Sequence, residues 1–272
     1  MLFKKNVPGK FSIKQGNLSI TSDVIKYVLV MGFIAWLSFN GTEKLGYNWQ
    51  WFRIPKYFFS FDGSEFLAGP LLRGFIITLH ITEMSIVLSL AIGLFTALLR
   101  LSNSVSGRLL ARLYLEIIRN TPLLVQLFFI YFVISPILDI GRLTSAVVAL
   151  SLFEGAYISE IFRAGILSMH GGQWEAAYSL GINRFHTYRI IILPQVLRRV
   201  LPSLTNQVIS LIKDSALVST IAIYDLTMEG RVIIAETYLT FEIWFTIAFI
   251  YLLLTASLSL SVNMMEKRLI NN

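Results

Sequence analysis

The sequence predicts an all-α integral membrane protein with about six transmembrane helices. Hydrophobic residues make up 55% of the 272 residues and charged residues only 14%, whereas about a quarter of an ordinary soluble domain is charged. Several apolar segments also approach the length of about 20 residues that a helix needs to cross a bilayer. Helices are expected because no backbone group can stay unpaired in lipid.

Six segments are predicted to span the membrane, two of them imperfectly. They are residues 27–42, 74–99, 120–138, 143–165, 200–224 and 243–265. The first is short, and the helix of the third is expected to begin near Arg112. The fifth is interrupted by Pro202 and by the pair Lys213 and Asp214. A bend at Pro202 would suit a gate, because irregular backbone at membrane depth lies in protein or lines a cavity. An ordinary proline kink is the alternative.

Basic residues predict the orientation, because short loops rich in Lys and Arg stay in the cytoplasm. With the N-terminus inside, the expected cytoplasmic segments hold fifteen of the 23 basic residues and only three acidic residues. Both termini are therefore expected in the cytoplasm. The first 26 residues show no signal peptide, so the first apolar segment is expected to remain as an anchor. The net charge of +7 follows from this topology and requires no nucleic acid partner.

A hydrophilic stretch, GGQWEAAYSLGINRFHTYRIIILP (171–194), lies in the largest expected cytoplasmic loop. Its WEAAYSL segment favours a short helix, with Glu175 in the first turn and Gly181 placed for a left-handed cap. Such a helix is marginal alone in water, so we expect it to pack on a partner, and Ala176 and Ala177 would allow close approach. A solvated connector is the alternative.

The spacing within this stretch resembles the cytoplasmic signature of bacterial ABC importer permeases. From Glu175 it reads Glu-Ala-Ala, three residues, Gly181, nine residues, Ile191, one residue and Leu193-Pro194. The resemblance implies a coupling helix that docks on a separate ATPase. The coupling residues would be Gln173, Glu175, Ala176, Ala177, Gly181, Leu193 and Pro194.

The chain has no phosphate-binding loop of the GxxxxGK[ST] type, which fits a membrane subunit whose motor is another polypeptide. ATP and Mg²⁺ are thus expected on the partner ATPase, and no cofactor is expected on this chain.

Three further stretches resemble the permeases for polar amino acids. They are EIIRNTPLLVQLFFIYF (116–132), GAYISEIFRAGI (155–166) and LIKDSALVSTIAIYDLT (211–227). Together with the loop they cover residues 74–265. The resemblance implies the five-helix core of a type I ABC importer permease, preceded by one extra N-terminal helix.

The domain organisation expected from this resemblance has two parts. Residues 1–70 would form an N-terminal cytoplasmic segment, the first transmembrane helix and an extracytoplasmic loop. Residues 71–272 would form the importer transmembrane domain, with its cytoplasmic coupling loop at 166–199. The implied partners are ABC ATPase subunits, a second copy or a related permease, an extracytoplasmic amino acid-binding protein and lipid. The implied location is the bacterial cytoplasmic (inner) membrane.

Charges at membrane depth are candidates for the substrate pathway. Glu116 and Glu160 each precede an arginine by three residues, Arg119 and Arg163, and we expect both to form ion pairs. Glu154 has no such neighbour and is expected to face a polar cavity and receive an ammonium group, although a role in helix packing is the alternative. Further pathway candidates are Gln126, Ser151 and Tyr157 for hydrogen bonding and Lys213 for a carboxylate.

Two other functional classes have weaker support. An ion-coupled secondary transporter would show inverted repeats, and no convincing pair is present. A polytopic membrane enzyme would need a catalytic constellation, but the histidines are scattered at positions 80, 170 and 186. No catalytic residue and no metal site is expected.

Overall fold

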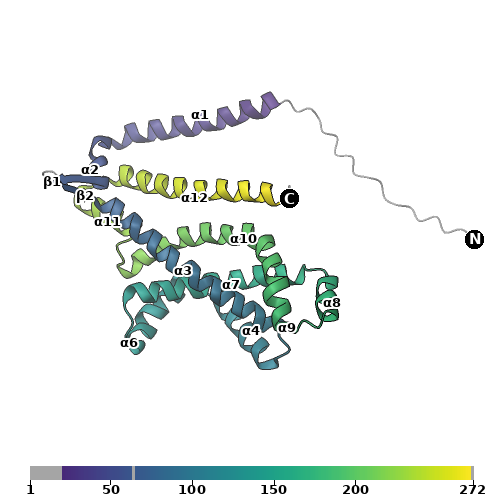
Figure 1. The fold of residues 1–272 in the computed structure, drawn as a ribbon. Coiled ribbons are helices and arrows are strands. Elements are labelled where there is room, and N and C mark those ends of the chain that lie inside the picture. Colours follow the sequence, from purple (N-terminus) through teal and green to yellow (C-terminus); the bar gives the residue numbers. More distant parts are fainter. Residues whose placement is uncertain (1–19, 63–64, 271–272) are drawn as a thin grey trace, which may run out of the picture. The chain divides into compact units, whose positions relative to one another are not determined.

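The structure, a computed structural model, describes residues 20–62 and 65–270. It divides into two compact units at the boundary between Trp49 and Gln50. The first unit contains helix α1 (Ile20–Leu45), which includes the first expected span (Figure 1). Within α1, the described apolar segment is Val24–Phe33, which is shorter than a bilayer is thick. The expected cytoplasmic segment before residue 20, with four of the five N-terminal lysines, lies outside the described residues.

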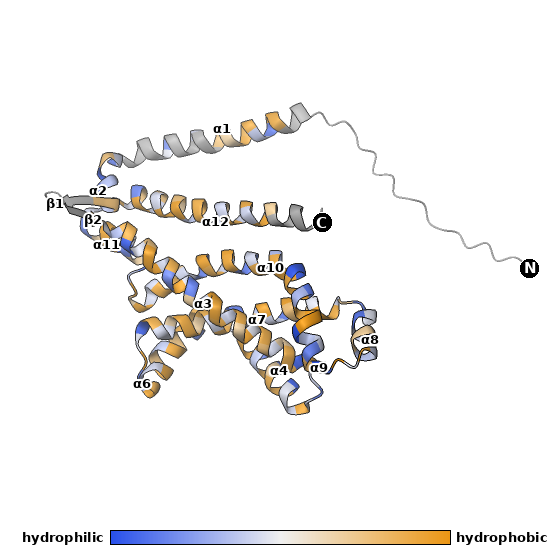
Figure 2. Cartoon of the chain, viewed as in Figure 1, coloured by the Kyte–Doolittle hydropathy of each residue, from blue (hydrophilic) through white to orange (hydrophobic). Residues whose placement is uncertain are grey.

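Three helices of the second unit are long and apolar enough to cross a membrane: α3 (Pro70–Leu101), α7 (Arg142–Leu167) and α12 (Thr240–Ile270). They coincide with the second, fourth and sixth expected spans. Apolar residues predominate along α3 and α12 in Figure 2. Two bent helix pairs bring the number of possible spans in the described residues to five. This predominantly helical framework confirms the predicted fold class.

The third expected span is a separate helix, and the expectation that it begins near Arg112 is wrong. Helix α4 (Val105–Arg119) ends before Pro122, and the chain bends by 107° into α5 (Leu123–Phe129), a π-helical turn η2 (Ile130–Ile134) and α6 (Ser135–Leu138). The residue before a proline is disfavoured in the α conformation, which explains the break.

The fifth expected span begins earlier than residue 200. Helix α10 (Leu193–Asp214) contains Pro202 and continues as a 3₁₀-helix, η4 (Ser215–Ile221). The ribbon changes direction along α10 in Figure 1. A second break follows at Ala222, where φ is 57°, and the chain bends by 50° into α11 (Leu226–Thr237). Helix α11 was not predicted from the sequence, and its N-cap Asp225 accepts hydrogen bonds from the amides of Thr227 and Met228.

Residues 50–70 belong to the second unit, whereas the expected domain boundary followed residue 70. They form η1 (Trp51–Arg53), α2 (Pro55–Phe58) and a hairpin of β1 (Phe59–Asp62) and β2 (Glu65–Ala68), in which Phe59 pairs with Ala68. Ile54 and Tyr57 pack in one hydrophobic cluster with Leu71, Leu226 and Leu239. This buried apolar surface holds the segment against α3 and α11.

The centre of the second unit is the contact between α3 and α7. Gly93 of α3 faces Ile158 of α7 so closely that an added Cβ would lie 2.5 Å from the Ile158 side chain. Gly155 of α7 faces Ile92 in the same way, at 2.9 Å. Small residues let membrane helices approach closely and gain dispersion contacts. Helix α7 also carries the candidate pathway residues Ser151, Glu154 and Tyr157, so this contact fixes their positions.

Candidate functional site

The short helix expected in this loop is present as α8 (Gly171–Ser179). Its C-terminus is closed by two hydrogen bonds, from the amide of Gly181 to the carbonyl of Tyr178 (2.9 Å) and from the amide of Ile182 to that of Ala177 (3.0 Å). Gly181 has φ +73°, so this is the left-handed cap that the sequence predicted. The helix begins at Gly171, after His170 in an extended conformation. Glu175 was expected in the first turn but lies beyond it.

The two alanines of α8 have different surroundings. Ala177 is 1% exposed, because this face of the helix packs against its own chain. Nearby, the Trp174 ring meets the Tyr188 ring edge-on at 4.9 Å. Ala176 and Glu175 are exposed. The expectation that both alanines face a partner is therefore wrong for Ala177 in this structure, and the free face of α8 begins at Ala176.

Two large apolar side chains extend this free face, and the sequence analysis missed both. Tyr178 is 49% exposed and Leu180 is 79% exposed. Exposed apolar groups beside small residues are typical of a docking surface. Their position after the Glu-Ala-Ala motif could have identified them from the sequence. Only the structure shows that Leu180, directly before the left-handed turn at Gly181, points away from the side of α8 that packs against the chain.

The remaining residues with a predicted coupling role lie in α8 and where the chain enters α10. Gln173 accepts a hydrogen bond from Gln195 Nε2 at 3.2 Å. Leu193 and Pro194 open α10, directly after α9 (Arg184–His186) and the π-helical segment η3 (Thr187–Ile192). Arg199 donates to the carbonyl and hydroxyl oxygens of Ser168 at 2.9 and 2.8 Å. The loop is thereby tied to the end of α7.

Glu154 is the most deeply buried of the candidate pathway residues with a charge. It is 2% exposed, and its Oε2 has no hydrogen-bond partner within the described residues. The carboxylate of Asp214, at the end of α10, repels the Glu154 carboxylate electrostatically. Glu154 lines none of four surface cavities found among the described residues. A carboxylate in this position has an unmet need for a donor or a cation.

Ser151 and Gln126 make their main hydrogen bonds within the protein. The Ser151 hydroxyl donates to the carbonyls of Val147 (2.5 Å) and Ser85 (3.2 Å), which joins α7 to α3. Gln126 Nε2 donates to the carbonyl of Ile118 at 2.8 Å and to Thr121, so it bridges the sharp bend between α4 and α5. The Oε1 of Gln126 is buried beside an apolar cavity of about 640 Å³ and has no hydrogen-bond partner in the described part of the chain.

A polar pocket of about 360 Å³ lies along α4, and the sequence analysis did not predict it. It is lined by Arg100, Arg112, Leu115, Glu116, Arg119 and Asn120. Arg112 and Arg119 are seven residues apart and share a helix face, a spacing that could have revealed the pocket. The Arg119 guanidinium carbon lies 5.9 Å from the ring centre of Tyr157, a cation–π contact that places this pathway candidate next to the pocket.

The two expected ion pairs had different outcomes. Glu160 pairs with Arg163 as predicted and also with Arg100 of α3. Glu116 instead accepts a hydrogen bond from Asn120 Nδ2 at 3.0 Å, and no ion pair with Arg119 is found among the described residues. Lys213 is exposed in the last turn of α10 and does not line the pocket.

Comparison with known proteins places this geometry in a family. Residues 89–271 match the family described as "Binding-protein-dependent transport system inner membrane component". The chain belongs to this family. It is 40% identical to the glutamine transport system permease protein GlnP of Escherichia coli (strain K12) over 206 residues, which cover 74% of this chain and 94% of the relative.

Solved structures give the same assignment for this permease. It is 39% identical to a chain of an amino acid ABC transporter crystallised with histidines, with a TM-score of 0.66 over 73% of this chain and 94% of that one. A chain of the inward-facing MetNI methionine ABC transporter has the same fold at 22% identity, with a TM-score of 0.64. The chain is thus a membrane-spanning ABC importer permease, a transport subunit.

The permease carries no group of three or more His, Cys, Asp or Glu side chains that could hold a metal ion within the residues that the structure describes. The candidate functional site consists of two surfaces. One is the free face of α8. The other is the set of polar side chains around Glu154 and the arginine-lined pocket on α4.

Proposed function

We propose that this permease forms the pathway through which an ABC importer carries polar amino acids across the bacterial inner membrane. The observation that carries the proposal is the 40% identity to a glutamine permease over nearly all of that relative. The paired ammonium and carboxylate of an amino acid also suit a pathway that offers both a buried carboxylate, Glu154, and guanidinium groups, Arg112 and Arg119.

In this proposal Glu154 receives the ammonium group and the arginines of the α4 pocket receive the carboxylate. The arginines replace Lys213 as the first choice, because Lys213 does not line the pocket. Tyr157 connects the two regions through its contact with Arg119 and its place one helical turn after Glu154. Gln126 and Ser151 position the helices that bound the pathway, since their donors are occupied by backbone carbonyls.

The free face of α8 is proposed to dock on a separate ATPase subunit, which would bind ATP and Mg²⁺. Glu175, Ala176, Tyr178 and Leu180 offer an exposed patch of small and apolar side chains with one charge. Two permease subunits, identical or related, would pair over two ATPases, and an extracytoplasmic amino acid-binding protein would deliver the substrate. Both chain termini and the loop at 166–199 would face the cytoplasm.

Uptake into proteoliposomes tests this proposal. The permease, an ATPase subunit and an amino acid-binding protein are reconstituted together, and uptake of radiolabelled glutamine, histidine and arginine is measured. We expect uptake of at least one of these amino acids only when ATP is present on the side of the membrane that carries the ATPase. Ionophores should not change this uptake. Uptake that requires an ion gradient and proceeds without ATP would instead support a secondary transporter. Chemical conversion of the substrate would support a membrane enzyme.

A further inference from the structure

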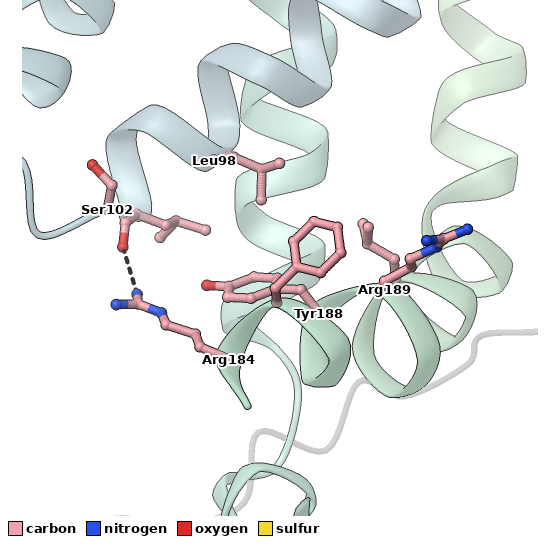
Figure 3. Close-up of a pocket in the computed structure, with 8 residues that line it drawn as sticks. Leu98, Ser102, Arg184, Tyr188 and Arg189 are labelled. Carbon is pink, nitrogen blue, oxygen red and sulfur yellow. Dashed lines mark hydrogen bonds between the residues drawn. The ribbon is translucent and has the colours of Figure 1, made fainter. Parts of the chain in front are cut away.

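A groove of about 500 Å³ lies where the end of α3 meets α9 and η3, and the proposed function does not use it. Its floor is apolar and aromatic, with Leu98 and Leu101 from α3, Tyr188 from η3 and Leu193 at the start of α10. Figure 3 shows Arg184 and Arg189 on either side of this floor. Among the described residues that line the groove, these two arginines are the only charged ones.

Each arginine keeps donors free for a ligand. Arg184 Nη2 lies 3.5 Å from the carbonyl of Leu101, at the outer limit of a hydrogen bond, and its guanidinium carbon lies 6.0 Å from the ring centre of Tyr188. A guanidinium has five N–H donors, so this contact leaves most of them free. Arg189 is exposed, and no hydrogen bond or ion pair is described for it. Capping of the α3 carbonyls explains Arg184 in part but does not explain Arg189.

The groove continues onto the apolar surface of α3. Phe95 is 64% exposed and lies one turn before Leu98 on this 32-residue membrane helix. Phe185, on α9, is 66% exposed at the other side. Aromatic and basic side chains gather where a membrane helix reaches the headgroup region. An apolar track that ends at two unneutralised arginines therefore lies at the level where a phospholipid changes from acyl chain to phosphate.

We infer that this groove binds an anionic phospholipid, with its phosphate on Arg184 and Arg189 and an acyl chain along Leu98 and Phe95. The ligand is required to be both anionic and apolar, because the walls carry positive charge and the floor carries hydrocarbon. A docked protein partner is less well matched, because the surface proposed to bind a protein is the free face of α8, which does not line this groove.

Native mass spectrometry of the intact permease–ATPase complex tests the inference. The detergent-solubilised complex is titrated with phosphatidylglycerol or with phosphatidylcholine of the same acyl chains. We expect phosphatidylglycerol to bind more tightly. Arg184→Gln and Arg189→Gln should each weaken its binding about fivefold, the effect of one basic residue at an anionic surface. Arg184→Lys should restore most of the loss. The matched control is Arg231→Gln, an exposed arginine on α11 outside the groove.

Three results would overturn the inference. One is equal binding of both lipids, and another is equal loss in the Arg231→Gln control. The third is a loss of ATPase or of the second permease from the double variant Arg184→Gln/Arg189→Gln with unchanged lipid binding, which would assign the groove to a protein interface. The melting temperature of each complex is measured in parallel, so that the comparison includes only variants that remain folded.

Discussion

The carbonyl oxygen of Gly155 lies 3.1 Å from the point where a Cβ on Gly93 would stand. This approach locks α3 against α7 at one position. We expect Gly93→Val to force the helices apart and to destabilise the permease by about 1–3 kcal/mol, as overpacking does in other cores. Thermal unfolding in detergent measures the change. Gly141→Ala is the control, because no atom of the described residues, apart from Gly141 and its two chain neighbours, lies within 4 Å of its added Cβ. Equal stability of both variants would contradict the prediction.

Glu154→Gln tests the buried carboxylate. The variant keeps the shape and removes the charge, and we expect uptake to fall about 10- to 100-fold, which corresponds to the loss of one hydrogen bond to a charged group of about 1.5–3 kcal/mol. Expression and co-purification with the ATPase should be unchanged. The control is Glu83→Gln, on the exposed face of α3. Wild-type uptake by Glu154→Gln would remove this residue from the pathway, and loss of folded protein would favour a packing role.

The two alanines of α8 should respond differently to tryptophan. Ala176→Trp adds bulk to the exposed face, so we expect weaker co-purification with the ATPase and an unchanged melting temperature. Ala177→Trp overpacks a side chain that is 1% exposed and should lower the melting temperature of the permease itself. Val105→Trp, on the exposed first turn of α4, controls for surface bulk. Identical behaviour of both α8 variants would show that the alanines share one environment.

Two substitutions at Gly181 test whether its left-handed backbone conformation is needed for coupling. At φ +73° a β-branched side chain is strained by about 1–3 kcal/mol, whereas asparagine tolerates this conformation. We therefore expect Gly181→Val to uncouple ATP hydrolysis from uptake and Gly181→Asn to retain most of the coupling. ATPase activity and uptake are measured on the same proteoliposomes. If Val and Asn act alike, the turn geometry is not the cause.

The proposed orientation predicts which single cysteines a membrane-impermeant thiol reagent can reach. The natural chain has no cysteine, which gives a clean background. Lys56→Cys, in the expected external segment, should be labelled in intact cells. Asn103→Cys, between α3 and α4, should be labelled only after the membrane is opened. Both positions are exposed, so the reverse pattern would mean that the chain is inserted the other way.

Local interactions are what the sequence by itself determined. The apolar lengths of α3, α7 and α12 follow from the thickness of the bilayer, and the closed end of α8 follows from a glycine that can adopt a positive φ. The pair between Glu160 and Arg163 was predictable because residues three apart meet on one helix. The break before α5 was also readable, since Thr121 precedes a proline.

Only the tertiary structure decided which sides of these helices meet. The spacing of Ala176 and Ala177 is the same in any helix, but packing against η3 buries one and leaves the other free. Glu116 has an arginine at the spacing of an ion pair, but it accepts a hydrogen bond from Asn120 instead. Asn120 is the residue at which α4 ends, and its side-chain amide turns back toward Glu116. The groove at Arg184 joins the end of α3 to α9 and η3, which are far apart in sequence. Its geometry depends on long-range packing, which helix periodicity alone does not encode.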